Sequence, residues 1–417
     1  MSDPSADAAD RHLAAQYEAF PYPARDPRDE KRRLIVGSPG HLREIDHWVF
    51  GARRPRHLPL RALIAGGGTG DATIMLAQQL ASAGRPGTVT WLDRSEAALR
   101  IARARAEARG LSNIVFHRGS LLDLPASGLG PFDYIDCCGV LHHLPSPEGG
   151  LAALAAVLAP GGGLGLMVYA PHGRTGVYML QDALRLLAPE TDPLPARLEM
   201  AKRTLRHLPP TAWMHRNPLI SDLAEGGDAG IYDLLLNPRD RAYTVPALFA
   251  LLASAGLAPT CLVEPARYDP AVWLPDPRLR ARVAALDPVQ RAALAEALAG
   301  NMKTHVVYAR RVSEWLAPPE AEAAEAVPVA RQQKAADLAA AVRPDGTLPM
   351  NFEGFQVPLP VPRLAAPILR LVDGARSVGE IGAAMADRVD PSGFQRAWSA
   401  LWTALNAANQ LLLVPPP

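Results

Sequence analysis

The sequence has few cysteines and no long apolar run. Three cysteines occur in 417 residues, and Cys137 and Cys138 are neighbours, a spacing that suits neither a disulfide nor a closed zinc site. We therefore expect no metal and a reducing, cytoplasmic setting. No stretch of about 18 residues is free of Pro, Gly and charge, and the first twenty residues lack the apolar segment of a signal peptide, so neither a membrane span nor export is expected.

The chain also has almost no net charge. Lys and Arg number 43 against 42 for Asp and Glu, so no long-range field gathers a polyanion, and a nucleic-acid partner is not expected. The basic residues of the segment from 96 to 109 do not share one helical face, and we expect them to be solvent-exposed: Arg100, Arg103, Arg105 and Arg109.

The length predicts more than one domain, because single cores stop growing at roughly 250–300 residues. The composition along the chain predicts an N-terminal cap over 1–60, a main domain over 61–312 with an insertion at about 171–243, a linker over 313–330 that is rich in Pro, Ala and Glu, and a small C-terminal module over 331–417.

Strand-like and helical segments alternate between residues 60 and 170. The predicted strands are RALIAG, TVTWLD, NIVFHRG, FDYIDCCGV and GGLGLMVYA. Helices are predicted between them, including Asp71–Ser82 and a segment capped by Ser95. Two more strands, PTCLVEPARY and THVVYARR, follow the insertion. The alternation indicates a doubly wound α/β fold with a mostly parallel sheet.

The first predicted strand runs into a glycine-rich turn. Gly66, Gly68 and Gly70 alternate with Gly67 and Thr69 before a helix begins at Asp71. Glycines let a backbone turn tightly and approach a ligand closely at a helix N-terminus. A dinucleotide fingerprint would require a third glycine at position 71, which is aspartate here, so the spacing differs from that of nicotinamide-binding folds.

Further candidates lie where later strands end, which is the ligand-binding edge of open α/β sheets. Asp93 ends the second strand, where a carboxylate can bind ribose hydroxyls, followed by Arg94. Ser120 and Leu121 follow the third strand, and either Ser120 or Asp123 would contact the base. Cys138 and Gly139 end the fourth strand.

Two neighbouring histidines follow that fourth strand. His142 and His143 are predicted to line the site, and His142 is a candidate general base; the alternative is a turn in which both rings have ordinary partners.

These motifs, taken in order, resemble the class I S-adenosylmethionine-dependent methyltransferase family over residues about 60–170. The resemblance implies a seven-stranded sheet that binds S-adenosylmethionine and releases S-adenosylhomocysteine. The predicted cofactor-binding residues are Gly66, Gly68, Thr69, Gly70, Asp71, Asp93, Arg94, Ser120, Leu121, Cys138 and Gly139. The acidic residue that the family commonly places two positions before the first glycine is Ile64 here.

Two shorter segments are similar to bacterial methyltransferases that carry a C-terminal regulatory module, some of which modify protein lysines. They are YEAFPYP at 17–23 and LVDGARS at 371–377. This similarity implies that residues 331–417 form a small helical or winged-helix-like domain.

The acceptor site is predicted from the cap, the end of the fifth strand and the insertion. The candidate substrate residues are Tyr17, Tyr22, His142, His143, Tyr169, Arg174, Asn237, Arg241 and Tyr243, of which His142 and Tyr169 are also the catalytic candidates. The string from Asp233 to Thr244 mixes charges, an amide and a tyrosine. Its alternative interpretation is a solvated loop in which Asp240 pairs with Arg239 or Arg241.

The sequence therefore predicts methyl transfer from S-adenosylmethionine to a small molecule or a protein side chain, lysine included. In-line displacement at a sulfonium requires alignment and exclusion of water, and a base only for a protonated acceptor. The alternatives are a non-catalytic S-adenosylmethionine sensor and an NAD(P)-dependent oxidoreductase.

Overall fold

The computed structural model describes residues 4–220 and 226–416. Residues 1–3 of the predicted cap, 221–225 of the predicted insertion and 417 of the C-terminal module lie outside the described residues. Within the two described ranges, none of the helices combines the length and the apolar character needed to cross a bilayer.

Seven strands form the central sheet in the order β3-β2-β1-β4-β5-β7-β6. Their bounds are β1 Leu60–Ala65, β2 Gly87–Asp93, β3 Ile114–Arg118, β4 Phe132–Cys138, β5 Leu158–Tyr169, β6 Leu257–Leu262 and β7 Thr304–Arg311. β1 to β5 pair in parallel, whereas β7 runs antiparallel to both of its neighbours. The prediction of a mostly parallel, doubly wound sheet is confirmed.

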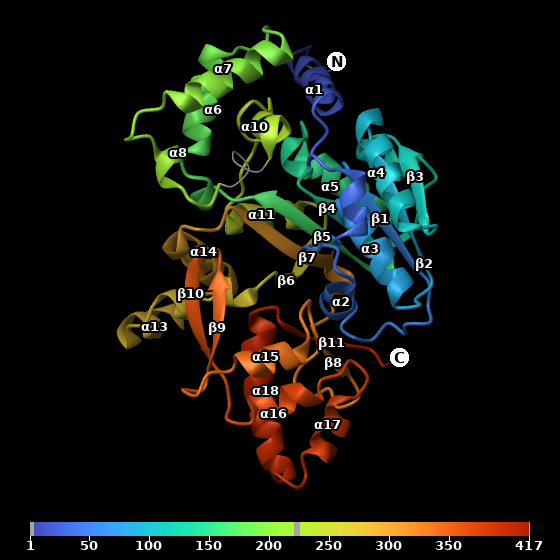
Figure 1. Cartoon of the computed structure of the whole chain (residues 1–417), viewed down its shortest axis with the longest axis vertical. Coiled ribbons are helices and arrows are strands. Elements are labelled where there is room, and N and C mark those ends of the chain that lie inside the picture. The colour runs from blue at the N-terminus through green and yellow to red at the C-terminus, as the bar shows by residue number, and fades with distance from the viewer. Residues whose placement is uncertain (1–3, 221–225, 417) are drawn as a thin grey trace.

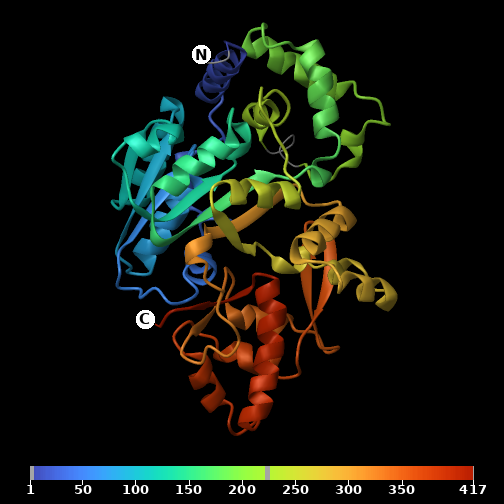
Figure 2. The same ribbon diagram turned by 180° about the vertical axis from the view of Figure 1, so that it is seen from behind.

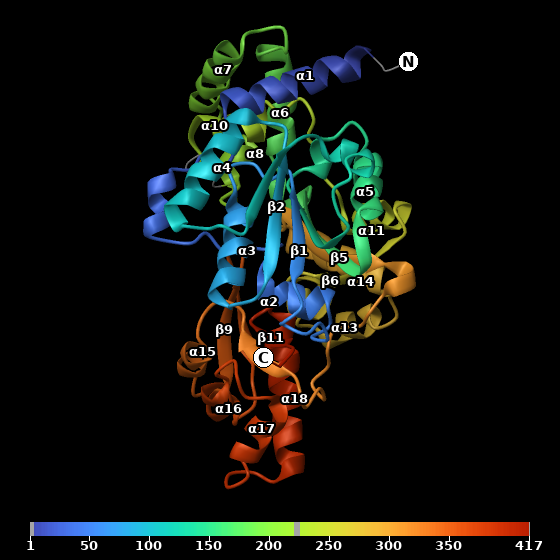
Figure 3. The ribbon, with the colours of Figure 1, turned by 90° about the vertical axis from the view of Figure 1, so that its right-hand side faces the viewer.

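Helices cover both faces of the sheet (Figure 3). α3 Asp71–Ser82 and α4 Glu96–Arg109 lie on one face, and α5 Pro147–Ala156 and α11 Val245–Ser254 lie on the other. In β1, Ile64 packs in one core with Leu76 of α3, while Leu63 packs in another with Leu151 of α5. Alternate side chains of a strand point to opposite faces, so this strand is apolar on both.

The first N-terminal helix and the insertion lie together above the sheet, whereas the second helix lies at the lower edge of the sheet, next to the C-terminal module (Figure 1). The N-terminal helices are α1 Pro4–Ala19 and the short α2 Leu42–Glu44, which continues as a π-helical turn at Ile45–Val49. The insertion contains α6 Val177–Leu187, α7 Leu194–Arg206, α8 Trp213–Arg216 and α10 Gly227–Leu235. Three more helices precede β7: α12 Pro270–Trp273, α13 Pro277–Val283 and α14 Pro288–Ala299.

The C-terminal module lies on the opposite side of the sheet from the insertion, as Figure 2 shows from behind. Its helices are α15 Ala335–Ala341, α16 Ala365–Leu371, α17 Val378–Ala384 and α18 Pro391–Ala407. Its strands form two antiparallel pairs, β9 Thr347–Phe352 with β10 Phe355–Pro360, and β8 Val327–Ala330 with β11 Leu411–Val414.

The structure corrects the predicted C-terminal boundary of the linker. Residues 327–330, which the composition assigned to the linker, form the buried strand β8. Val327 packs in the same core as Trp48 and Leu76, and Ala321 packs with Trp398 of α18. The composition did not predict this strand because it has only four residues and pairs with β11, about eighty positions later in the chain. Neighbouring residues do not indicate such a pairing.

Candidate active site

The glycine turn lies between the end of β1 and the start of α3. Gly66, Gly68 and Gly70 have φ values of +76°, +47° and +105°, in the left-handed region that side chains disfavour. A Cβ at Gly66 would lie 2.2 Å from Val140 Cγ2. Only glycine therefore fits this path, and the backbone at Gly66 and Gly68 stays partly exposed.

Asp93 connects the end of β2 to this turn. Its carboxylate accepts hydrogen bonds from the backbone amides of Gly68, at 2.8 Å, and Ser95, at 3.0 Å. Burial raises the pKa of Asp93, and these amides act in the opposite direction. A carboxylate has about four lone-pair positions, so this one keeps capacity for further donors. Ser95 caps α4 as predicted, by accepting from the Ala98 amide.

The segment after α1 covers the glycine turn. Thr69 Oγ1 donates to the Pro23 carbonyl at 2.7 Å, and Arg25 pairs with Asp71 at 2.7 Å. A Cβ at Gly68 would lie 2.9 Å from the Tyr22 carbonyl oxygen. Residues 22–25, which we call the strap, thus lie directly over the turn.

A buried arginine of α4 binds the residues at the N-terminus of α3. Arg105 contacts Asp71 at 2.6 Å, Glu30 at 2.6 Å and the Thr69 carbonyl at 2.9 Å. Arg109 also pairs with Glu30. The prediction that these arginines are solvent-exposed is wrong for Arg105, which is 1% exposed, and for Arg109, whose side chain is 13% exposed; it holds for Arg100 and Arg103. Its partner Glu30 lies 75 positions away, so no local pattern reveals the pair.

The other predicted cofactor residues lie along the same edge of the sheet. Arg94 is exposed and pairs with Asp10, and Ser120 caps a 3₁₀ turn in which Leu121 is buried. Cys138 and Gly139 are partly exposed at the end of β4. Contact of these residues with a cofactor stays a prediction.

Two tyrosines and an aspartate meet where α1, β5 and α10 converge. Tyr17 donates to Asp233 Oδ1 at 2.8 Å, and Tyr169 donates to Asp233 Oδ2 at 3.2 Å. Asn237 Nδ2 donates to the Tyr17 hydroxyl at 3.3 Å. Burial raises the pKa of Asp233, partly offset by His143 and by the Tyr17 hydroxyl. The sequence placed the segment from Asp233 to Thr244 in the acceptor site. It did not predict that the Asp233 carboxylate would bind both tyrosine hydroxyls.

Both predicted histidines lie beside this cluster. The His142 ring centroid is 4.1 Å from that of Tyr169 and 4.2 Å from that of His143. His143 Nδ1 contacts the Arg239 carbonyl, whereas neither ring nitrogen of His142 has a hydrogen-bond partner among the described residues. Burial, with His143 and Arg174 nearby, lowers the pKa of His142 well below its usual value. His142 is thus a neutral imidazole at neutral pH.

Arg174 forms the wall behind Tyr169. Its guanidinium lies 3.7 Å from the Tyr169 ring centroid and pairs with Asp240 at 2.7 Å, both side chains being buried. The alternative pairing of Asp240 with Arg239 or Arg241 is therefore wrong. Arg241 instead approaches Glu148 at 3.5 Å and lies over the ring of Tyr243. The Tyr243 side chain packs into the core with residues of α11, and its backbone N–H donates to the Tyr169 carbonyl at 2.8 Å.

Residues 63–164 match the family model described as a methyltransferase domain. That range contains the glycine turn, Asp93 and both histidines. These residues therefore form a methyltransferase domain. Outside it, the tyrosine cluster takes Tyr17 from the cap and Asp233 from the insertion.

The chain is also similar to known proteins over part of its length. The chain is 37% identical over 190 residues to an uncharacterized protein of Synechococcus sp., which covers 44% of this chain and 43% of that protein. It is 34% identical over 137 residues to the ubiquinone biosynthesis O-methyltransferase of Thiobacillus denitrificans, which covers 33% of this chain and 53% of that enzyme. The chain thus spans about half the length of each relative.

Two solved structures of PKMT2 from Rickettsia typhi each match most of the chain. PKMT2 from Rickettsia typhi, in complex with AdoHcy, aligns with a TM-score of 0.63 over 90% of this chain and 75% of that one, at 14% sequence identity. At that identity the likeness concerns the fold, and it extends well beyond the methyltransferase domain.

Proposed function

We propose that this chain binds S-adenosylmethionine at the Gly66–Gly70 turn and transfers its methyl group to an acceptor held beside Tyr169. The observation that carries the proposal is Asp93, a partly exposed carboxylate hydrogen-bonded to the Gly68 amide at 2.8 Å. Its position within the methyltransferase domain supports a ribose-binding role.

The residues at this edge fit the cofactor chemically. Asp93 keeps acceptor positions for ribose hydroxyls, and the partly exposed backbone of Gly66 and Gly68 suits the amino-acid end. Ser120 and Leu121 are proposed to contact the adenine. The bound cofactor would supply a methyl group on a sulfonium.

The tyrosine cluster is the proposed acceptor site. Asp233 holds the hydroxyls of Tyr17 and Tyr169, which fixes the aromatic wall. Methyl transfer depends mainly on alignment and exclusion of water, and this buried wall supplies both. The neutral, unpartnered imidazole of His142 is the proposed acceptor of a proton from a protonated substrate. A small molecule or a protein side chain, lysine included, is the proposed acceptor class.

Calorimetric titration tests the cofactor site. We expect Asp93→Asn to weaken binding of S-adenosylmethionine and S-adenosylhomocysteine roughly tenfold to a hundredfold, because charge-assisted bonds to ribose are lost. Asp387→Asn, which changes an exposed carboxylate in the C-terminal module, serves as the control and should bind as the parent does. Absence of binding by the parent protein would end the proposal. Labelled methyl transfer into a fractionated lysate then tests catalysis, and binding without transfer would identify a sensor instead.

The strap predicts how fast the cofactor exchanges. Arg25→Ala removes the pair with Asp71, which we expect to speed dissociation of S-adenosylhomocysteine several-fold, because the strap then opens more readily. Stopped-flow fluorescence measures that rate. The matched control is Arg28→Ala, since Arg28 is exposed and, within the described part of the chain, its side chain pairs with the nearby Asp26. Equal rates in both variants would show that the strap does not gate this site.

A further inference from the structure

A cavity of about 200 Å³ lies between the methyltransferase domain and the C-terminal module. Its walls come from three parts of the chain: Ser38 of the N-terminal segment, residues of β7 and the 263–268 segment, and residues of the C-terminal module. The full lining is Ser38, Val263, Glu264, Arg267, Tyr268, Thr304, Val306, Arg331, Glu353, Asn409 and Gln410. None of these belongs to the glycine turn or to the tyrosine cluster.

One side of the cavity holds an arginine between two carboxylates. Arg267 Nη1 lies 3.3 Å from Glu264 Oε2, and Nη2 lies 2.7 Å from Glu353 Oε2. Arg267 is only 8% exposed, and its buried Nε has no hydrogen-bond partner among the described residues. The contacts to Arg267 involve Oε2 alone, so Oε1 of each glutamate keeps its capacity to accept.

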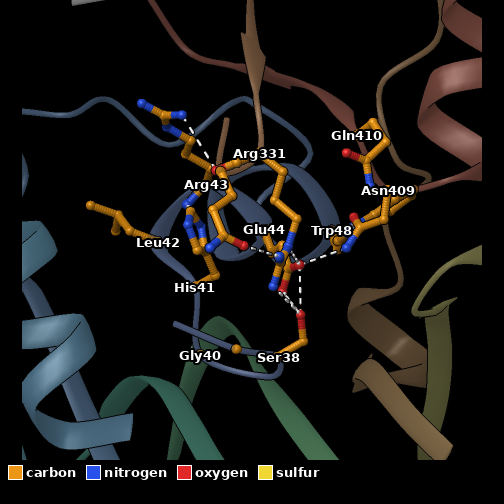
Figure 4. A network of polar contacts seen from close by, with 12 residues as sticks. Ser38, Gly40, His41, Leu42, Arg43, Glu44, Trp48, Arg331, Asn409 and Gln410 are labelled. Carbon is orange, nitrogen blue, oxygen red and sulfur yellow. Dashed lines mark hydrogen bonds and ion pairs between the residues drawn. The ribbon is translucent and has the colours of Figure 1, made fainter. Parts of the chain in front are cut away.

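The other side is formed by Arg331, which a buried network holds in place (Figure 4). Arg331 pairs with Glu44 and donates to Ser38 Oγ at 2.7 Å. Glu44 is 0% exposed and also accepts from Asn409 Nδ2 at 2.6 Å. A guanidinium carries five N–H groups, so Arg331 keeps donors for a ligand while its position is fixed.

Three of the four non-glycine residues with positive φ in the described ranges line the cavity: Glu264 at +59°, Glu353 at +46° and Asn409 at +55°. Glu353 and Gly354 form the two-residue hairpin turn between β9 and β10, which requires positive φ, and Asn409 follows the C-cap of α18, where asparagine tolerates this conformation. Glu264 is neither in such a turn nor a residue type that favours this region, so its backbone is strained, as residues at ligand sites often are.

We propose that this cavity binds a free α-amino acid as its zwitterion. The lining carries two arginines and two glutamates, so its balance of charge suits a neutral ligand bearing both signs. The ligand carboxylate would bind N–H groups of Arg331 and Arg267, and its ammonium group would bind Oε1 of Glu264 and Glu353. Val263 and Val306 offer apolar surface to a side chain. The described residues include no group of three potential metal ligands, which disfavours a cation site.

This site is separate from the proposed methyl-transfer site. A ligand there would touch the N-terminal segment, the sheet and the C-terminal module at once, and would stabilise their arrangement by binding only the assembled state. The experiment therefore omits S-adenosylmethionine, so its outcome does not depend on the proposed function.

Calorimetry of the full chain tests the proposal, with each common L-α-amino acid titrated singly. We expect at least one to bind with 1:1 saturation, while propionate and n-propylammonium, which carry one charge each, do not. Glu264→Gln should raise Kd roughly tenfold or more. Glu325→Gln, an exposed glutamate outside the lining, and Asp93→Asn should leave Kd unchanged.

Circular dichroism of each variant checks that the fold is retained; should Glu264→Gln fail to fold, Glu353→Gln replaces it with the same expected rise in Kd. The proposal is overturned if no amino acid binds to the parent, or if affinity survives in a folded variant that lacks one of these carboxylates.

Discussion

Replacing Arg105 with alanine is expected to lower the free energy of unfolding by about 3 kcal/mol. The guanidinium is buried and contacts Asp71, Glu30 and the Thr69 carbonyl, and breaking a buried ion pair costs roughly 3–5 kcal/mol because a buried charge loses its partner. The lower end of that range applies because, in the alanine variant, Asp71 is still paired with Arg25 and Glu30 is still paired with Arg109.

Urea unfolding followed by tryptophan fluorescence measures this loss. Arg103→Ala is the matched control, since Arg103 lies on the same helix but is exposed; its effect should stay within about 0.5 kcal/mol. Arg105 also supports the glycine turn through Thr69, so S-adenosylmethionine binding should weaken in the alanine variant. A stability equal to that of the parent would contradict the buried network.

Replacing Asp136 with asparagine is expected to raise stability by about 3 kcal/mol at pH 8. Asp136 is 0% exposed in β4, where burial raises its pKa to about 7; the Tyr134 hydroxyl donates to Oδ2 at 3.0 Å, and Oδ1 has no partner among the described residues. In the unfolded chain the pKa of this carboxyl is about 3.9. Between that pH and about pH 7, Asp136 is therefore protonated in the folded state and ionised in the unfolded chain. Ionising the folded carboxyl above pH 7 costs on the order of 4 kcal/mol of stability. The asparagine variant avoids this cost, but part of the benefit is lost because the N–H groups of the new amide stay unpaired.

The sign of the pH dependence distinguishes this cause from better packing. Between the two pKa values the folded parent binds more protons than the unfolded chain, so its free energy of unfolding falls as the pH rises from about 4 to 7. The advantage of the asparagine variant should thus stay nearly constant between pH 8 and 7 and narrow as the pH is lowered from about 7 to 4. Asp133→Asn should instead lower the free energy of unfolding, because Asp133 in the same strand is paired with Arg61 and Arg54. A pH-independent difference for Asp136→Asn would refute the buried ionisation.

Local patterns predicted the parts of the site that depend on neighbouring residues. Ser95 caps the helix that it was predicted to cap, and Gly66–Gly70 turns at the end of β1. Each of these depends on residues within a few positions, and backbone conformation or a cap has a residue-type signature.

Contacts across long separations were not predictable in the same way. Asp233 meets Tyr17 over 216 positions and Tyr169 over 64. Asp240 and Arg174 pair over 66 positions, although adjacent arginines offered closer partners. These pairings depend on where the insertion returns over the sheet, and a single sequence carries no record of that path. The ion pair between Arg267 and Glu353 was not predicted for the same reason.

The position of β7 between β5 and β6 determines how the polypeptide can be divided. β5 obtains its outer partner only when residues 304–311 arrive, more than a hundred positions after β5 itself ends. A shortened fragment that stops after α11 would present an unpaired strand of apolar residues, which invites intermolecular pairing and precipitation. A shortened chain that keeps the methyltransferase domain and an intact sheet therefore has to extend through Arg311.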